Sequence, residues 1–109
     1  MFEVHRTAKF SAWLDSLADT KARGAVITRL LRLALGNAGD VKPVGSGVSE
    51  MRIDIGPGYR AYYMRVDQQV LLMLGGGNKS SQSQDISRAL KMAAALRAPA
   101  KAEKRRKKK

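Results

Sequence analysis

Residues 49–66 read SEMRIDIGPGYRAYYMRV, and this stretch decides the fold of the 109-residue chain. Apolar residues alternate with polar ones over 49–55, which is typical of a strand with one buried face. The Gly-Pro-Gly sequence at 56–58 indicates a turn, and a second strand-like run follows it at 59–66. A third such run occupies 69–74 after another short turn. We therefore expect an antiparallel meander of three strands.

The segments before the meander differ in their apolar spacing. The short alternation over 2–6 predicts a strand, and apolar residues at i, i+3, i+4 and i+7 over 10–17 predict a helix. A second apolar stripe over 22–34, which includes Ile27, predicts another helix, so the two form a helical hairpin. Residues 36–48 hold four glycines and one proline and are expected to form a loop.

A last helix is expected after the meander, starting near a capping box at Ser81 and Gln84 and ending before Pro99. The order is strand, helix, helix, three strands, helix. This order predicts an α+β fold with the helices packed on one face of an antiparallel sheet. We expect one domain over residues 1–97 and a disordered basic tail over 98–109.

The net charge of +12 is an argument about partners, and polyanions are the candidates. The last eleven residues hold seven Lys or Arg and one Glu, so they carry half of this excess. The other half belongs to the body of the chain. We therefore expect a surface that contacts nucleic acid.

Several classes of function are excluded by composition. The chain has no cysteine, which excludes thiolate catalysis, disulfides and cysteine metal sites, and one histidine, His5, which excludes a His-rich metal site. Gly75-Gly76-Gly77 lacks the spacing of a phosphate-binding loop and indicates a strand end or bulge. We expect no cofactor. The chain shows neither a signal-peptide pattern nor a membrane span, so we expect it in the cytoplasm.

The second face of the meander gathers cationic groups. Arg52 on one strand and Arg60 and Tyr62 on the next share a face, and Lys79 follows the third strand. Guanidinium and ammonium groups bind phosphate oxygens, and a tyrosine can stack on a base or transfer a proton. The set therefore suits a phosphodiester. The alternative is a solvated sheet face with ordinary cross-strand Arg–Asp pairs.

Four motifs together resemble a known family. They are F-x-x-W-L-x-x-L at 10–17, G-N-x-G-D-x-K-x-V-G-x-G-V at 36–48, E-M-R-I-D-x-G-P-G-Y-R-x-Y-Y at 50–63, and L-x-G-G-x-K-x-x-Q-x-x-D-I at 74–86. This pattern resembles the "addiction module killer protein" group of the RelE/ParE toxin superfamily, close to HigB toxins. The resemblance covers about residues 2–95, nearly all of the expected folded part.

The resemblance implies a RelE-like fold, with a helical hairpin and a C-terminal helix on a small curved antiparallel sheet. It also implies the toxin of a type II toxin–antitoxin module, a ribosome-dependent mRNA endonuclease that acts through 2′-hydroxyl attack. Such a toxin would arrest translation and growth and be neutralised by a cognate antitoxin. The partners would be mRNA on the ribosome and an adjacently encoded antitoxin, expected to be a helix-turn-helix protein, with no membrane partner. The toxin alone would be a monomer and would form a higher-order complex with the antitoxin. The catalytic residues carried over are Arg52, Arg60, Tyr62 and Lys79.

Further contacts to nucleic acid are expected from Lys42, Asp54 and Gln82, and from Arg105 and Arg106 in the tail. HigB-type nucleases often use histidines near the site, which this chain lacks beyond His5. The general base is therefore open between Tyr62, Lys79 and a carboxylate. Two other functions stay open: inhibition of DNA gyrase, as in the ParE branch, and non-catalytic RNA binding by a regulator of phage origin.

Overall fold

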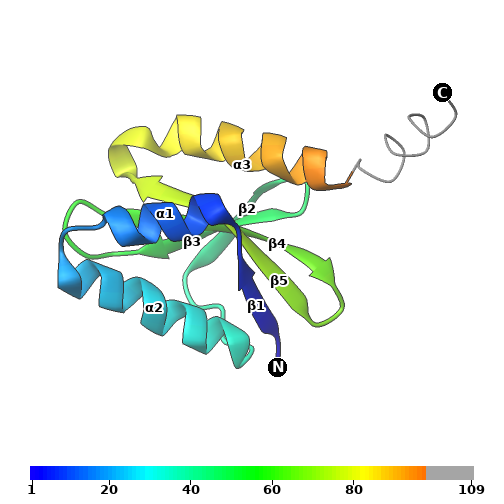
Figure 1. Ribbon diagram of the computed structural model, residues 1–109, viewed down its shortest axis with the longest axis horizontal. Helices are drawn as coiled ribbons and strands as arrows, with labels where there is room; N and C mark the ends of the chain where they lie inside the picture. The colour runs from blue at the N-terminus through cyan, green and yellow to red at the C-terminus, as the bar shows by residue number, and fades with distance from the viewer. Residues whose placement is uncertain (98–109) are drawn as a thin grey trace, which may run out of the picture.

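The computed structural model describes residues 1–97, and its elements follow one another as a strand, two helices, four strands, a short 3-10 turn and a helix (Figure 1). The predicted tail over 98–109, with Arg105 and Arg106, lies outside the described residues. The bounds are β1 (Glu3–Arg6), α1 (Ala8–Ser16), α2 (Thr20–Ala34), β2 (Val41–Gly45), β3 (Val48–Ile53), β4 (Tyr59–Asp67), β5 (Val70–Asn78), η1 (Lys79–Ser81) and α3 (Gln82–Arg97).

The α+β class is confirmed, and the predicted meander is the centre of a five-stranded sheet in the order β1-β5-β4-β3-β2. Strands β3, β4 and β5 are antiparallel, as expected. The expectation of a wholly antiparallel sheet is wrong, because β1 pairs in parallel with β5 and sets Glu3 opposite Val70. The sheet is therefore mixed, with the N-terminal strand at one edge.

The other edge strand, β2, corrects the expected loop over 36–48. Residues 41–45 pair antiparallel with β3, with Pro43 opposite Ser49 and a register shift before Gly45. Proline lacks an N–H and is tolerated in a sheet only where that donor is not needed, chiefly on edge strands. The proline and glycines that predicted a loop are therefore compatible with a short edge strand.

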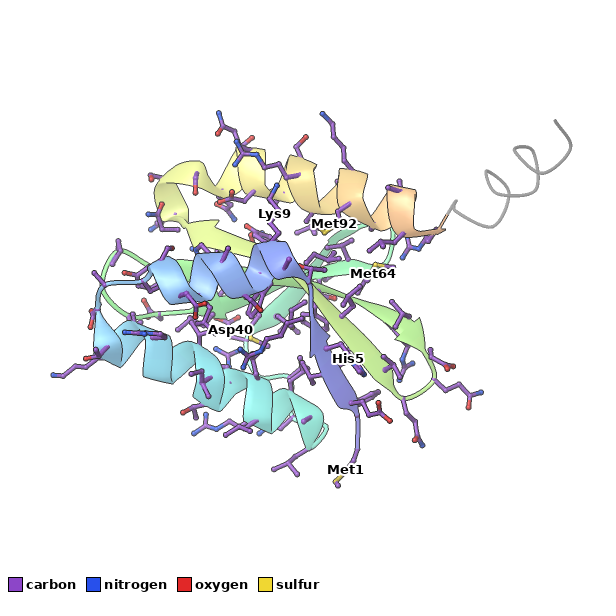
Figure 2. The ribbon with its side chains drawn as sticks, in the orientation of Figure 1. Met1, His5, Lys9, Asp40, Met64 and Met92 are labelled. Carbon is purple, nitrogen blue, oxygen red and sulfur yellow. The ribbon has the colours of Figure 1, made fainter. Side chains whose placement is uncertain are left out.

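Helices cover both faces of the sheet, which corrects the expectation of a single covered face. On one face, α1 and α2 pack their buried residues, such as Phe10 and Val26, against Met51 and Met73 of the strands. On the other face, Ala89 and Ala93 of α3 pack against a smaller cluster that includes Tyr62. Figure 1 shows α3 apart from the blue and cyan helices α1 and α2. Met64 and Met92 both lie on the α3 side (Figure 2).

The helix ends are fixed by side-chain caps. Thr7 caps α1 by accepting a hydrogen bond from the Phe10 N–H at 3.0 Å. Asp19 caps α2 by accepting a hydrogen bond from the Lys21 N–H at 2.9 Å. The capping box forms one turn earlier than predicted, between Asn78 and Ser81, and begins η1.

Two adjacent glycines let helices approach the sheet from its opposite sides. A Cβ at Gly76 would overlap the ring of Trp13 in α1, and a Cβ at Gly77 would overlap the carboxylate of Asp85 in α3. Both glycines belong to β5. Their lack of a side chain therefore sets how closely each helix packs.

Residues 1–97 contain no helix that is both long and apolar enough to cross a bilayer.

Candidate functional site

An open cleft of about 280 Å³ lies where the β3–β4 turn meets the start of η1. Arg52, Arg60 and Lys79 all line it, so the structure brings together three of the four residues predicted to be catalytic. The predicted binding residue Asp54 lines the cleft too, together with Asp40. The Gly-Pro-Gly turn at 56–58 forms the remaining rim with Ile53 and Tyr59.

The strand register places the two arginines side by side. Arg52 of β3 lies directly opposite Arg60 of β4, and the connecting turn needs positive φ angles of 55° at Gly56 and 82° at Gly58. Like charges directly opposite each other on one sheet face repel. An anion in the cleft would offset this repulsion, so the pairing of two guanidinium groups favours an anionic ligand.

Lys79 reaches the cleft from the far end of β5. Its backbone N–H donates to the Gly58 carbonyl at 2.9 Å, which ties η1 to the tip of the β3–β4 turn. The Lys79 side-chain stem also lies within 4 Å of the position that a Cβ on Gly58 would occupy. The turn and the lysine therefore form one wall of the cleft.

Each arginine has a carboxylate of its own. Arg52 contacts Asp40 at the exposed rim, with Nη2 and Nε at 3.2 and 3.3 Å from Oδ1. Arg60 is largely buried, and its Nε lies 3.6 Å from Oε2 of the fully buried Glu50. That separation is beyond ordinary hydrogen-bonding distance, and the Arg60 Nε has no hydrogen-bond partner among the described residues.

Glu50 is the centre of a buried polar network beneath the cleft. Its Oε2 accepts hydrogen bonds from the Tyr62 hydroxyl and from the Gln82 side-chain amide, both at 2.9 Å. Its Oε1 finds no hydrogen-bond partner within residues 1–97. A buried carboxylate is costly unless it is paired, so Arg60 and these two donors together stabilise it.

Tyr62 shares the face of Arg60 but is covered by α3 rather than open to the cleft. Its side chain is 1% exposed and packs with Val48, Met64 and Leu74. Burial, and then the hydrogen bond to Glu50, raises the pKa of the Tyr62 hydroxyl above its ordinary value. The phenol is therefore a neutral hydrogen-bond donor near pH 7, with no exposed ring on which a base could stack.

The remaining predicted binding residues are dispersed. Lys42 is exposed on the edge strand β2, opposite Glu50 in the register but outside the residues that line the cleft. Gln82 is turned inward, to Glu50. Asp85, which follows Gln82 by three residues, accepts from Ser81 at 2.5 Å and lies 3.5 Å from Arg88, so it orders α3 rather than the cleft cations.

Glu50 and Asp40 are site residues that the sequence reasoning missed. Glu50 is two positions before Arg52 on the same strand face, so alternation alone could have placed it beside Tyr62. Asp40 belongs to the segment interpreted as a loop, and its carbonyl also accepts from the Arg52 N–H at 2.9 Å.

Searches for similar proteins identify both a sequence relative and a structural one. No family model matches the chain. A Haemophilus influenzae protein described as uncharacterised is 38% identical over 94 residues, which cover 86% of this chain and 95% of that protein. The solved structure of a mutant of the E. coli toxin RelE in the free state superposes with a TM-score of 0.68.

The RelE match covers 84% of this chain and 96% of the toxin at 16% sequence identity, so it concerns the fold. It agrees with the α+β arrangement of three helices on a curved five-stranded sheet in residues 1–97. The chain therefore has the RelE-like fold, and it belongs to the family of the Haemophilus influenzae protein.

Proposed function

We propose that this protein is the toxin of a toxin–antitoxin module and that it cleaves mRNA on the ribosome. The observation that carries the proposal is the convergence of Arg52, Arg60 and Lys79 on one open cleft. The RelE-like fold and the motifs shared with the HigB-like toxins support the same function. We further propose that the exposed Lys42 contacts the RNA outside the cleft.

The proposed reaction is transfer of an RNA phosphodiester to the neighbouring 2′-hydroxyl. A bond forms between the 2′-oxygen and phosphorus, and the bond from phosphorus to the 5′-oxygen breaks, leaving a cyclic phosphate. Negative charge accumulates on the phosphorane oxygens in the transition state. Arg52 and Arg60 would bind these oxygens and Lys79 would stabilise the leaving oxygen, which is electrostatic catalysis by preorganised charge.

The same geometry suggests how the protons are handled. Tyr62 is buried and its pKa is raised, which disfavours it as a general base. Asp54 is an exposed carboxylate that lines the cleft, so we propose that it accepts the 2′-hydroxyl proton. Tyr62 and Glu50 then act as positioning residues, since they contact Arg60 or its partner rather than the RNA.

The test is mapping of mRNA ends in a translation system supplied with the purified full-length protein. Arg60→Ala is expected to slow cleavage by about 10²–10³-fold, as for loss of one preorganised oxyanion donor. Arg65→Ala is the matched control, because it removes the same charge from the same strand on the side where Arg65 lies over Phe2. The proposal fails if Arg60→Ala leaves both cleavage and growth arrest intact.

The same experiment separates the alternatives. A gyrase inhibitor would leave mRNA whole while supercoiling stalls and DNA damage signalling begins. A non-catalytic regulator would bind RNA in a salt-sensitive way without turnover or growth arrest. Co-expression of the adjacent reading frame tests the antitoxin, which should restore growth if it is the partner.

A further inference from the structure

The outer face of α2, continued by its C-cap residue, carries a row of exposed apolar side chains. Ile27, Leu31 and Leu35 follow one another at four-residue spacing and are 37%, 63% and 70% exposed. The sequence pattern assigned Ile27 to the core stripe, which is wrong, because α2 buries Ala22, Val26, Leu30 and Leu33 instead. A helix that is already packed on one face therefore presents a second apolar row to solvent.

The row is flanked by positive charge. At 100° per residue, Arg23 lies on one side of it, and Lys21 and Arg32 lie on the other. Within residues 1–97 none of these three takes part in an ion pair. The helix itself, over 20–34, contains no acidic residue. The fourth cation, Arg29, is already engaged by the carbonyls of Arg52, Ala38 and Asp40.

The row is also narrow and accessible. Gly24 continues it by one turn, and a Cβ added there would meet nothing within 4 Å. A small residue beside a single line of branched side chains leaves grooves into which the ridges of another helix can pack. A lipid surface is better matched by a broad apolar face with aromatic residues, which this row lacks.

We infer that α2 is a docking surface for an amphipathic helix of another protein, one whose apolar row is flanked by Asp or Glu. Its apolar row would pack on Ile27, Leu31 and Leu35 while its carboxylates pair with Lys21, Arg23 and Arg32. A second copy of this chain fits poorly, because two such helices would bring like charges together. The surface is separate from the cleft, so the inference does not rest on the proposed nuclease activity.

The probe is a synthetic helical peptide with leucines at i, i+4 and i+7 and glutamates on both flanks. Its binding to the labelled full-length chain is followed by fluorescence anisotropy, and the contacted residues are mapped by NMR. Leu31→Glu should weaken binding by at least about tenfold, equivalent to 1.4 kcal/mol. Val66→Glu is the matched control, because Val66 is an exposed apolar residue outside α2, and it should leave binding unchanged.

The inference is overturned if the glutamate peptide does not bind, or if a version of the peptide with lysine flanks binds equally well. It is also overturned if Leu31→Glu binds the peptide as tightly as the wild type does, or if the chain forms a dimer that Leu31→Glu dissociates. Anionic vesicles that bind the chain through Leu31 more tightly than the peptide does would also overturn it and assign the face to a membrane. Thermal melting checks that each variant folds. Arg60→Ala should bind the peptide normally and Leu31→Glu should cleave RNA normally, so this proposal and the nuclease proposal can fail separately.

Discussion

The two faces of the sheet are built on different principles. The face under α1 and α2 is an apolar core, in which Phe10 and Met73 are fully buried among other hydrophobic residues. The face under α3 buries a carboxylate and a phenol next to a much smaller apolar cluster. The first face supplies most of the stabilising apolar burial. The second face is less stabilising, because it buries the charge of Glu50 beside Arg60. Substitutions on each face should therefore separate folding from activity.

The largest loss of stability is expected on the apolar face. Phe10→Ala leaves a cavity beneath α1 and should lower the free energy of unfolding by about 3–5 kcal/mol. Urea denaturation measures the loss. Phe10→Leu, which keeps most of the volume, is the control and should cost less than about 1.5 kcal/mol. RNA cleavage per folded molecule should be unchanged in both, and a specific loss of cleavage would break the division between the faces.

Glu50→Gln should have a smaller effect on stability and a larger one on activity. The variant keeps the shape of the side chain but removes the charge beside Arg60, so we expect the free energy of unfolding to fall by about 1–3 kcal/mol. Cleavage should fall by about tenfold because Arg60 is no longer held in place, a cost of 1.4 kcal/mol in the transition state. Single-turnover rates and urea denaturation measure the two effects. Activity equal to the wild type would remove Glu50 from the site.

Tyr62→Phe removes the hydrogen bond to Glu50 and should cost about 1 kcal/mol at pH 7. The folded state raises the pKa of Tyr62, so this stabilisation is complete below the ordinary value of 10.0 and is lost as the pH rises above it. Urea denaturation from pH 8 to 11 should show that the difference in free energy of unfolding between wild type and variant decreases as the pH rises. A gap that does not change with pH would contradict the buried, protonated phenol.

Asp40→Asn should have the smallest effect on stability. The Arg52–Asp40 pair is exposed, so its loss should lower the free energy of unfolding by no more than about 1 kcal/mol. The effect should be smaller at high salt, because salt screens exposed charges. Freed from its carboxylate, Arg52 should bind phosphate more tightly, and filter binding should show a few-fold gain in RNA affinity. Weaker binding would mean that Asp40 orients Arg52 for the substrate rather than competing with it.

The sequence was sufficient for the parts of the fold governed by local spacing. Alternation and the Gly-Pro-Gly turn place Arg52 and Arg60 on one face, and the register confirms it. The predictions were wrong where tertiary context overrides local preference. The segment that contains Pro43 can form a strand because it lies at the edge of the sheet. Acidic residues such as Glu50 are rarely fully buried, so no local sequence signal predicts the burial of Glu50.

Apolar spacing also could not predict which residues of a helix are buried or which face of the sheet a helix covers. Ile27 fits the apolar stripe of α2 as well as Val26 does, and the structure buries only Val26. The predicted catalytic set stays a prediction, since spacing placed Tyr62 on the correct face without indicating that α3 covers it.

The parallel pairing of β1 with β5 has a consequence for how the molecule is made. Strand β1 has its partner about 67 residues later in the chain, where Glu3 meets Val70 and Arg6 meets Met73. Contacts so distant along the chain slow folding. Lys79, the last cationic residue of the cleft, follows directly after β5. The partner strand of β1 and the cleft residue Lys79 are therefore synthesised at the same stage of translation. A chain interrupted before β5 has neither a complete sheet nor a complete cleft.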